Sequence, residues 1–99
     1  MEFQIRNYWI KPGSMDQFLD VWKNGVVPLR KQAGFKVLGS WVNRVENRFT
    51  WIVGFDGPGT FDQAYRAYMD SPGRKSLNPD PASLLAKSDV IIMTQVLSE

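Results

Sequence analysis

Residues 35–56, with the sequence FKVLGSWVNRVENRFTWIVGFD, constrain the fold of this 99-residue chain more than any other stretch. They read as two apolar strands joined by a polar turn at residues 45–48, the pattern of a β-hairpin. Strict alternation places on one face Phe35, Val37, Gly39 and Trp41 of the first strand and Phe49, Trp51, Val53 and Phe55 of the second. The other face carries Leu38, Val42, Ile52 and Gly54, so both faces are apolar.

An antiparallel sheet with one face in water alternates apolar and polar residues, so a hairpin that is apolar on both faces needs two covering layers. A chain of 99 residues has little material for both layers. We therefore expect a partner subunit to cover one face, which predicts a homodimer.

Residues 2–10 and 88–97 are predicted as two further strands. In the first, alternation separates Phe3, Ile5, Asn7 and Trp9 from Gln4, Arg6, Tyr8 and Ile10. The last strand, SDVIIMTQVL, is again apolar on both faces.

A first helix is expected between these strands, starting at a capping box of Ser14 and Gln17. Its apolar residues recur every three or four positions, at Met15, Phe18, Leu19, Trp22, Val26 and Leu29. Pro28 follows Gly25 closely and should kink the helix near position 24, and Gly34 should end it.

A second helix is expected to start at a capping box of Thr60 and Gln63 and to end at residues 71–73. Its apolar residues are Phe61, Ala64, Tyr65, Tyr68 and Met69. Residues 74–80 read as irregular, and Asp80 before Pro81 predicts a short helical turn through residue 86.

The predicted order, strand, helix, strand, strand, helix, strand, is the ferredoxin-like βαββαβ pattern of the α+β class. Right-handed crossovers then put both helices on one face of an antiparallel sheet. We expect residues 1–99 to form one domain whose uncovered face packs against a second copy.

Composition excludes several classes of function. A net charge of +2, with basic and acidic residues mixed along the chain, gives no basic face for nucleic acid. The chain has no cysteine and no histidine, which removes thiolate and imidazole metal ligands and the Ser-His triads, so we expect no metal and no cofactor. No window approaches the ~20 apolar residues of a membrane span, so a cytoplasmic location with no membrane contact is expected.

Several segments together resemble the NIPSNAP family: IRNYWIKPGSMDQF, VVPLRKQAGFKVLGSW, FTWIVGFD, SPGRK and SDVIIMT, in that order. The resemblance is carried by Arg6 with Tyr8, by Pro12-Gly13, by Gly34, by Gly39-Ser40-Trp41 and by residues 72–74. It implies a dimeric α/β barrel. Related barrels include cofactor-independent monooxygenases, haem-degrading enzymes, isomerases and polyketide cyclases, which hold their ligand between a subunit's helices and sheet.

Arg6 is the sharpest candidate for a binding site, because it places a permanent cation in a strand expected at the centre of the sheet. It either anchors a carboxylate or enolate, with Tyr8 on the same face, or forms an ion pair within the chain or across an interface, for example with Asp56 or Asp89. Arg74 either reaches back over the sheet or stays solvated as a helix cap.

The remaining candidate ligand-binding residues are Asn7, Trp41, Trp51 and Tyr68. Aromatic residues most often build cores and interfaces, but lining a pocket they would favour a flat apolar ligand. We expect a pocket for a small aromatic or carbonyl-bearing molecule. The alternatives are a cofactor-independent enzyme of the monooxygenase, isomerase or cyclase type, and a structural dimer that recruits another protein.

Overall fold

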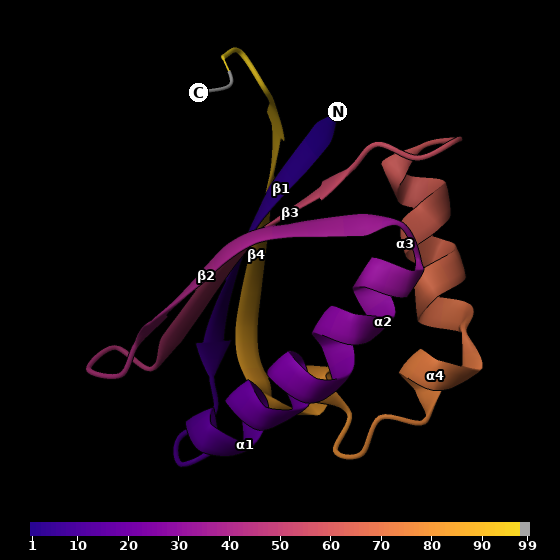
Figure 1. The fold of residues 1–99 in the computed structure, drawn as a ribbon. Coiled ribbons are helices and arrows are strands. Elements are labelled where there is room, and N and C mark those ends of the chain that lie inside the picture. Colours follow the sequence, from indigo (N-terminus) through magenta and orange to yellow (C-terminus); the bar gives the residue numbers. More distant parts are fainter. Residues whose placement is uncertain (98–99) are drawn as a thin grey trace.

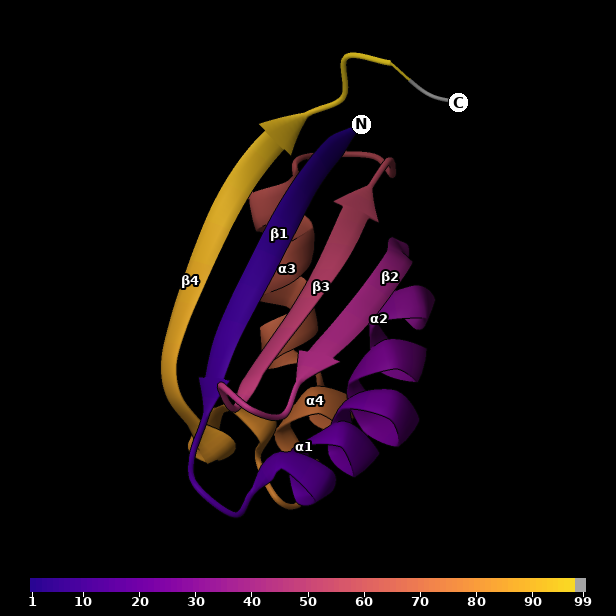
Figure 2. The same ribbon diagram turned by 90° about the vertical axis from the view of Figure 1, so that its left-hand side faces the viewer.

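A computed structural model, which describes residues 1–97, contains one four-stranded antiparallel sheet with helices on one of its faces (Figures 1 and 2). The strands are β1 (Glu2–Ile10), β2 (Phe35–Asn43), β3 (Arg48–Phe55) and β4 (Leu85–Thr94). They lie in the order β2-β3-β1-β4, with β1 and β3 in the middle. This confirms the ferredoxin-like βαββαβ prediction.

The helical segments all lie behind the sheet in Figure 2, which leaves its front face bare. They are α1 (Met15–Val21), the π-helical segment η1 (Trp22–Val26), α2 (Val27–Gln32), α3 (Phe61–Asp70), α4 (Pro72–Lys75) and the 3₁₀ turn η2 (Pro81–Leu84). The predicted irregularity near position 24 is confirmed as the widened turn of η1, which contains Gly25. Pro28 sits in the first turn of α2, and Gly34, with φ of 93°, follows the end of that helix.

The two predicted capping boxes have different outcomes. At α3 the box is present, because Oγ1 of Thr60 accepts from the Gln63 amide at 3.1 Å and Oε1 of Gln63 accepts from the Thr60 amide at 3.0 Å. At α1 the prediction is wrong, since Ser14 makes no side-chain capping bond. The Ser14 amide donates to the Lys11 carbonyl in a turn, and this holds the Ser14 backbone out of the extended conformation typical of a cap.

A β-bulge in β2 overturns the predicted faces of that strand. Val37 pairs with Val53, and the next pair is Gly39 with Ile52, so Leu38 is an extra residue in the ladder. Every residue after the bulge therefore changes face. Phe35 faces the helices, whereas Trp41 lies on the bare face and is 57% exposed.

The core lies between the sheet and the helices and is rich in aromatic rings. The four residues predicted to share one face of β3 are buried in it: Phe49, Trp51, Val53 and Phe55. They meet Phe18 and Trp22 from the first helical segments, with ring centres of Trp22 and Phe49 4.8 Å apart in an edge-on arrangement.

The last segments are displaced from their predicted bounds. Four residues of the stretch around Arg74 form α4, and β4 starts at Leu85 because that residue already pairs with Ile10. β4 ends at Thr94 because its partner Glu2 is the first residue of β1. The length of the neighbouring strand, rather than local composition, therefore sets the length of β4.

A row of isoleucines crosses the bare face of the sheet. Ile5 pairs with Ile52 of β3 on one side and with Ile91 of β4 on the other. Phe3 and Met93 lie opposite each other further along the same strands. This face therefore presents apolar side chains that no helix of residues 1–97 covers.

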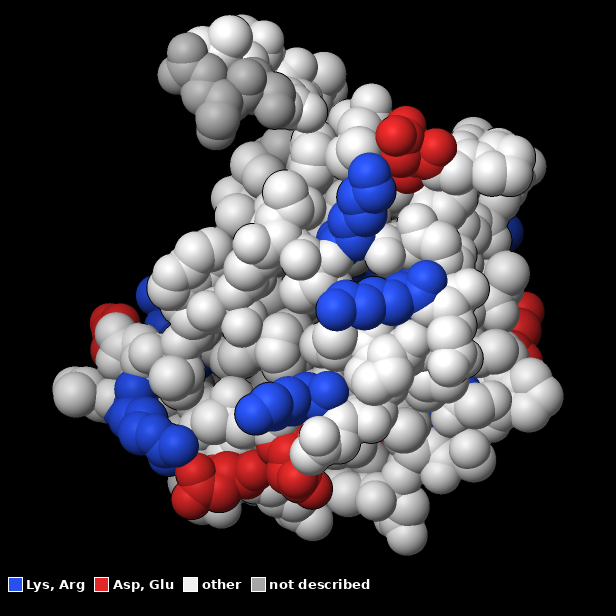
Figure 3. Space-filling view, in the orientation of Figure 1, with Lys and Arg blue, Asp and Glu red and all other residues white. Residues whose placement is uncertain are grey.

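Charged side chains on the face seen in Figure 3 stand as separate groups, with acidic residues beside some of the basic ones. Among the helices that the structure describes, none has the length and hydropathy to cross a membrane.

Candidate functional site

A cavity of about 180 Å³ lies between the sheet and the helices. Its walls come from β1, β3, the helical segments α1, η1 and α2, the helix α3, and the stretch from α4 to the start of β4. The polar part of its lining includes three arginines and three tyrosines: Arg6, Arg30, Arg74, Tyr8, Tyr65 and Tyr68. The cavity thus combines an apolar body with several cationic and phenolic groups.

Arg6, Tyr8 and Trp51 form a hydrogen-bonded cluster on the sheet wall of this cavity. Arg6 and Trp51 are register partners on the two central strands, and Tyr8 follows Arg6 on the same face of β1, as predicted. Nε of Arg6 donates to Oη of Tyr8 at 2.8 Å, and Nε1 of Trp51 donates to the same oxygen at 3.0 Å. A phenol oxygen that accepts two hydrogen bonds keeps its own proton for a third partner. Tyr8 is therefore oriented as a hydrogen-bond donor.

Arg6 has neutral partners in place of a carboxylate. Its Nη1 donates to Oε1 of Gln4 at 2.8 Å, and its guanidinium lies 5.3 Å from the ring centre of Tyr65. Burial lowers the pKa of Arg6, but its charge and hydrogen-bond interactions with Tyr8 and Tyr65 outweigh burial and raise it.

Neither predicted ion pair of Arg6 is present among residues 1–97. Asp89 is the register partner of Asn7, so it lies on the bare face of the sheet, and Asp56 is exposed after the end of β3. The ion pairs of the described chain join other arginines to acids. An ion pair of Arg6 with Asp56 or Asp89 within one chain is therefore absent from this structure, and a pair across an interface stays a prediction.

Arg30 is a buried cation that the sequence analysis missed. It lies on α2, is only 2% exposed, and is enclosed by four rings. Its guanidinium carbon is 4.4 Å from the ring centre of Tyr68, 4.7 Å from Phe35, 5.0 Å from Tyr65 and 5.3 Å from Trp51. Such contacts stabilise a cation, but the face of an aromatic ring does not replace a hydrogen-bond acceptor for the N–H groups of the guanidinium. Within residues 1–97, Nε and Nη1 of Arg30 have no hydrogen-bond partner.

Desolvation, followed by repulsion from the nearby Arg6, lowers the pKa of Arg30 to about 10. The side chain is therefore still a cation at pH 7. One sequence signal could have revealed it: Arg30 follows Trp22 and Val26 at successive intervals of four residues, so it continues their apolar stripe.

Arg74 reaches back toward the sheet, which decides between its two predicted positions. It is 8% exposed, lines the cavity, and its Nη2 lies 3.1 Å from Oδ1 of Asp80. Its backbone amide donates to Oγ of Ser71, which caps α4. Among the three cavity arginines, Arg74 thus has a carboxylate partner within residues 1–97, whereas Arg6 and Arg30 do not.

Two further buried donors lack a partner in the described part of the chain, Oη of Tyr68 and Nε1 of Trp22. Burial raises the pKa of Tyr68, against the lowering effect of Arg30 and Arg74, so the phenol is neutral at pH 7. Buried polar atoms are normally hydrogen-bonded, and unpaired ones often mark a functional site.

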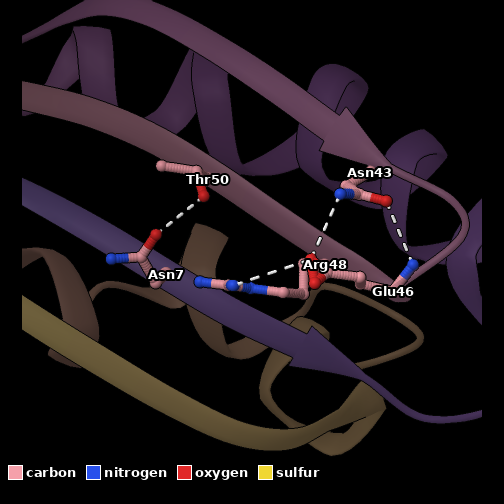
Figure 4. A network of polar contacts seen from close by, with 5 residues as sticks. All are labelled: Asn7, Asn43, Glu46, Arg48 and Thr50. Atoms are coloured by element: carbon pink, nitrogen blue, oxygen red, sulfur yellow. Dashed lines mark hydrogen bonds and ion pairs between the residues drawn. The ribbon is translucent and has the colours of Figure 1, made fainter.

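Two of the predicted site residues lie outside the cavity. Trp41 is on the bare face because of the bulge in β2. Asn7 alternates away from Arg6 and Tyr8 onto that same face, where its Oδ1 accepts from Oγ1 of Thr50 at 2.7 Å (Figure 4). The network in Figure 4 also links Asn43, Glu46 and Arg48 near the β2–β3 turn. The predicted residues Arg6, Tyr8, Trp51, Tyr68 and Arg74 do line the cavity.

Within residues 1–97, no three acidic side chains are grouped so that they could hold a metal ion. The polar groups of the cavity are cations and hydrogen-bond donors, which suit an anion or a carbonyl oxygen.

Comparison with other proteins identifies the family. The family model named NIPSNAP matches residues 3–97. A NIPSNAP domain protein from Burkholderia xenovorans superposes with a TM-score of 0.81 at 15% identity, covering 97% of this chain and 95% of its own. A NIPSNAP family protein of unknown function from Agrobacterium tumefaciens has a TM-score of 0.81 at 21% identity, covering 94% and 86%.

The same fold occurs in an antibiotic biosynthesis monooxygenase, with a TM-score of 0.70 at 19% identity over 98% of this chain and all of the other. At these identities the likeness shows the fold alone. Among curated protein sequences, none matches this chain.

Proposed function

The chain belongs to the NIPSNAP family, and we propose that it binds a small aromatic or carbonyl-bearing molecule, with an oxygen acceptor, between its helices and its sheet. The observation that carries this proposal is that the hydroxyl oxygen of Tyr8 accepts two hydrogen bonds. Arg6 and Trp51 both donate to its oxygen, which leaves the phenol proton for a ligand. The complementary group on that ligand is a carbonyl, carboxylate or enolate oxygen.

The size and lining of the cavity set the scale of the ligand. A dry engineered cavity of ~150 Å³ accommodates benzene. The cavity here has about 180 Å³ and a wall of aromatic side chains that includes Phe18, Trp22 and Trp51. A molecule with one ring, or a short branched acid of that size, fits this space.

A cofactor-independent enzyme is the second candidate, and the same phenol favours it. A proton donor beside a cation is the equipment needed to stabilise an enolate and return a proton to it. The monooxygenase with this fold adds an analogy at the level of fold only. The binding protein and the enzyme would use the same cavity, so one ligand screen tests both proposals.

Binding is tested by thermal shift with benzoate, against benzyl alcohol as a neutral ligand with the same ring. We expect benzoate to raise the unfolding midpoint of the wild type. Arg6→Ala should stay folded and lose that response, whereas Arg66→Ala, which alters an exposed arginine of α3, should keep it.

Two results would contradict the proposal. No response of the wild type to benzoate or to other small ring acids would remove the ligand class. A strongly destabilised Arg6→Ala protein that still responds to benzoate would make Arg6 a structural residue.

The bare face of the sheet supports a homodimer as the form that carries this site. Its row of Ile5, Ile52 and Ile91 is apolar, and Ile91 is 47% exposed in the single chain. Beside this row lie Asp89 and the cations Arg48 and Lys87, so a second copy rotated by a two-fold axis offers opposite charges as well as apolar contact. The alternative of a structural dimer that recruits another protein would leave the cavity without a ligand.

A further inference from the structure

Two cations face the cavity without a counter-charge among residues 1–97, Arg6 and Arg30. A buried guanidinium without a carboxylate partner is costly, and the cost is removed when a bound anion supplies the missing charge. We propose that the ligand is a compact dicarboxylate, with one carboxylate at each arginine. This inference rests on the proposed function and specifies its ligand class.

The first subsite consists of the Arg6 guanidinium and the Tyr8 hydroxyl. Gln4, on the other side of Arg6, is neutral and accepts from its Nη1. The acidic residues Glu2 and Asp62 line a separate groove that also borders Arg6. Neither is within ion-pair distance of Arg6, and Asp62 is paired with Arg66 at 3.0 Å. A ligand carboxylate therefore has no competing acid at this subsite in the described chain.

The second subsite is the ring-enclosed Arg30. Its Nε and Nη1 have no hydrogen-bond partner within residues 1–97, although four rings surround the guanidinium. The Tyr68 hydroxyl lines the same cavity and also lacks a partner in residues 1–97. A ligand carboxylate at this subsite can accept one charge-assisted hydrogen bond from Arg30 and another from the Tyr68 hydroxyl.

The two subsites are close but separate. Both guanidinium groups contact the ring of Tyr65. Cζ of Arg6 lies 5.3 Å from its ring centre, and Cζ of Arg30 lies 5.0 Å from it. The two cations are therefore no more than about 10 Å apart, and their mutual repulsion contributes to the lowered pKa of Arg30. This span suits two carboxylates on one ring or on a short chain. A monocarboxylate would leave one arginine uncompensated.

The test is calorimetric titration of the full chain at pH 7 with isophthalate, monomethyl isophthalate and benzoate, which share one ring. We expect isophthalate to bind at least ~10-fold more tightly than its half ester, since a charge-assisted hydrogen-bonded contact contributes that much or more. Arg30→Met should abolish the difference in affinity between isophthalate and its half ester. Arg30→Lys should keep part of it, and Arg66→Met, the exposed control, should keep all of it.

The possible failures are distinguishable. Equal affinity of the wild type for isophthalate and its half ester overturns the dicarboxylate but leaves the proposed monoanion pocket standing. A preference for the diacid that survives in Arg30→Met overturns the second subsite. Tighter binding of inorganic phosphate than of isophthalate overturns the pair of separate subsites in favour of one compact anion. No binding of any ring acid overturns the proposed function and this inference with it.

Discussion

The guanidinium carbon of Arg30 lies 4.4 Å from the ring centre of Tyr68, on the inner side of α2. Three more rings complete the enclosure, so aromatic faces replace the water that a surface arginine would have. They do not replace its hydrogen bonds, because two of its nitrogens have no acceptor in residues 1–97. Under the proposed function, this arrangement would favour ligand binding at the expense of the stability of the free protein.

Arg30→Met should therefore stabilise the ligand-free protein, because methionine fills similar space without a charge to desolvate. We expect the free energy of unfolding in urea at pH 7 to rise by about 1–3 kcal/mol, part of the desolvation gain being offset by the lost cation–π contacts. Arg66→Met, at an exposed position of α3, should change it by less than ~0.5 kcal/mol. A clear loss of stability in Arg30→Met would mean that the four rings more than compensate for burial.

The difference in the free energy of unfolding between Arg30→Met and the wild type should depend on pH, because the pKa of Arg30 is lowered to about 10 in the folded protein. Below pH 10 the side chain is protonated in both states, and the full cost of burying the cation is present. Above pH 10 the folded state releases the proton first, so the cost declines as the pH rises toward the higher pKa of the unfolded chain. The advantage of Arg30→Met over wild type should thus shrink by roughly 1 kcal/mol between pH 9 and pH 11. Urea unfolding of both proteins at the two pH values measures it, and a constant difference would contradict the shifted pKa.

Removing the Tyr8 hydroxyl should destabilise the protein, because Tyr8→Phe leaves Nε of Arg6 and Nε1 of Trp51 without their acceptor. The expected loss is about 1–3 kcal/mol in the free energy of unfolding. Tyr68→Phe is the matched control, since its hydroxyl has no partner in the described chain, and it should be neutral or slightly stabilising. Equal effects of the two substitutions would show that the hydrogen bonds to Tyr8 contribute nothing measurable.

The bare face of the sheet predicts how the oligomer responds to charge. Light scattering after gel filtration should give about twice the chain mass of 11.3 kDa for the wild type. Ile91→Asp, in the middle of the isoleucine row, should give a folded monomer, because a buried unpaired carboxylate is costly at an apolar interface. Val45→Asp, in the β2–β3 turn and 97% exposed, should stay dimeric. A monomeric wild type would remove the homodimer from the proposal.

The two helix starts provide a direct comparison of capping. Thr60→Ala should lower the free energy of unfolding by about 0.5–2 kcal/mol, because the Gln63 amide loses its acceptor. Ser14→Ala should have no comparable effect, since the Ser14 side chain makes no capping bond. Equal losses at both positions would indicate that Ser14 caps α1 in solution.

Local patterns in the sequence were sufficient for most of the fold. The alternation in residues 2–10 predicted the limits of β1 and the pairing of Arg6 with Tyr8 on one face, because both depend only on the two-residue period of a strand. The cap at Thr60 was also predictable, because it depends only on Thr60 and on Gln63 three residues later. The start of β4 could not be predicted from local sequence, because it is set by the pairing of Leu85 with Ile10, 75 positions away.

Two of the errors at the site, those at Trp41 and Arg30, have a common physical origin in single inserted residues. The extra residue at Leu38 reverses the faces of β2, so Trp41 was predicted in the pocket and lies on the bare face. The widened turn of η1 displaces the stripe of the helix by one position, so Arg30 is fully buried and was missed, while Leu29 is only half-buried against the core. A strict two-residue period contains no signal for the insertion in β2. For the helix, the signals were the irregularity predicted near position 24 and the four-residue spacing of Trp22, Val26 and Arg30.

The widened turn of η1 also decides which place along the chain supplies the buried cation. In an α-helix each residue turns by about 100°, so the seventh residue after Trp22 lies closer to the stripe of Trp22 than the eighth does. With the widened turn, it is the eighth residue, Arg30, that is buried. Deleting one residue of η1, such as Asn24, would close the turn and move the arginine to the seventh place, so the cation would still face the cavity. A relative without the widened turn can therefore carry the same cation one position earlier in its chain, and a comparison of the two sequences without a gap in this helix would miss it.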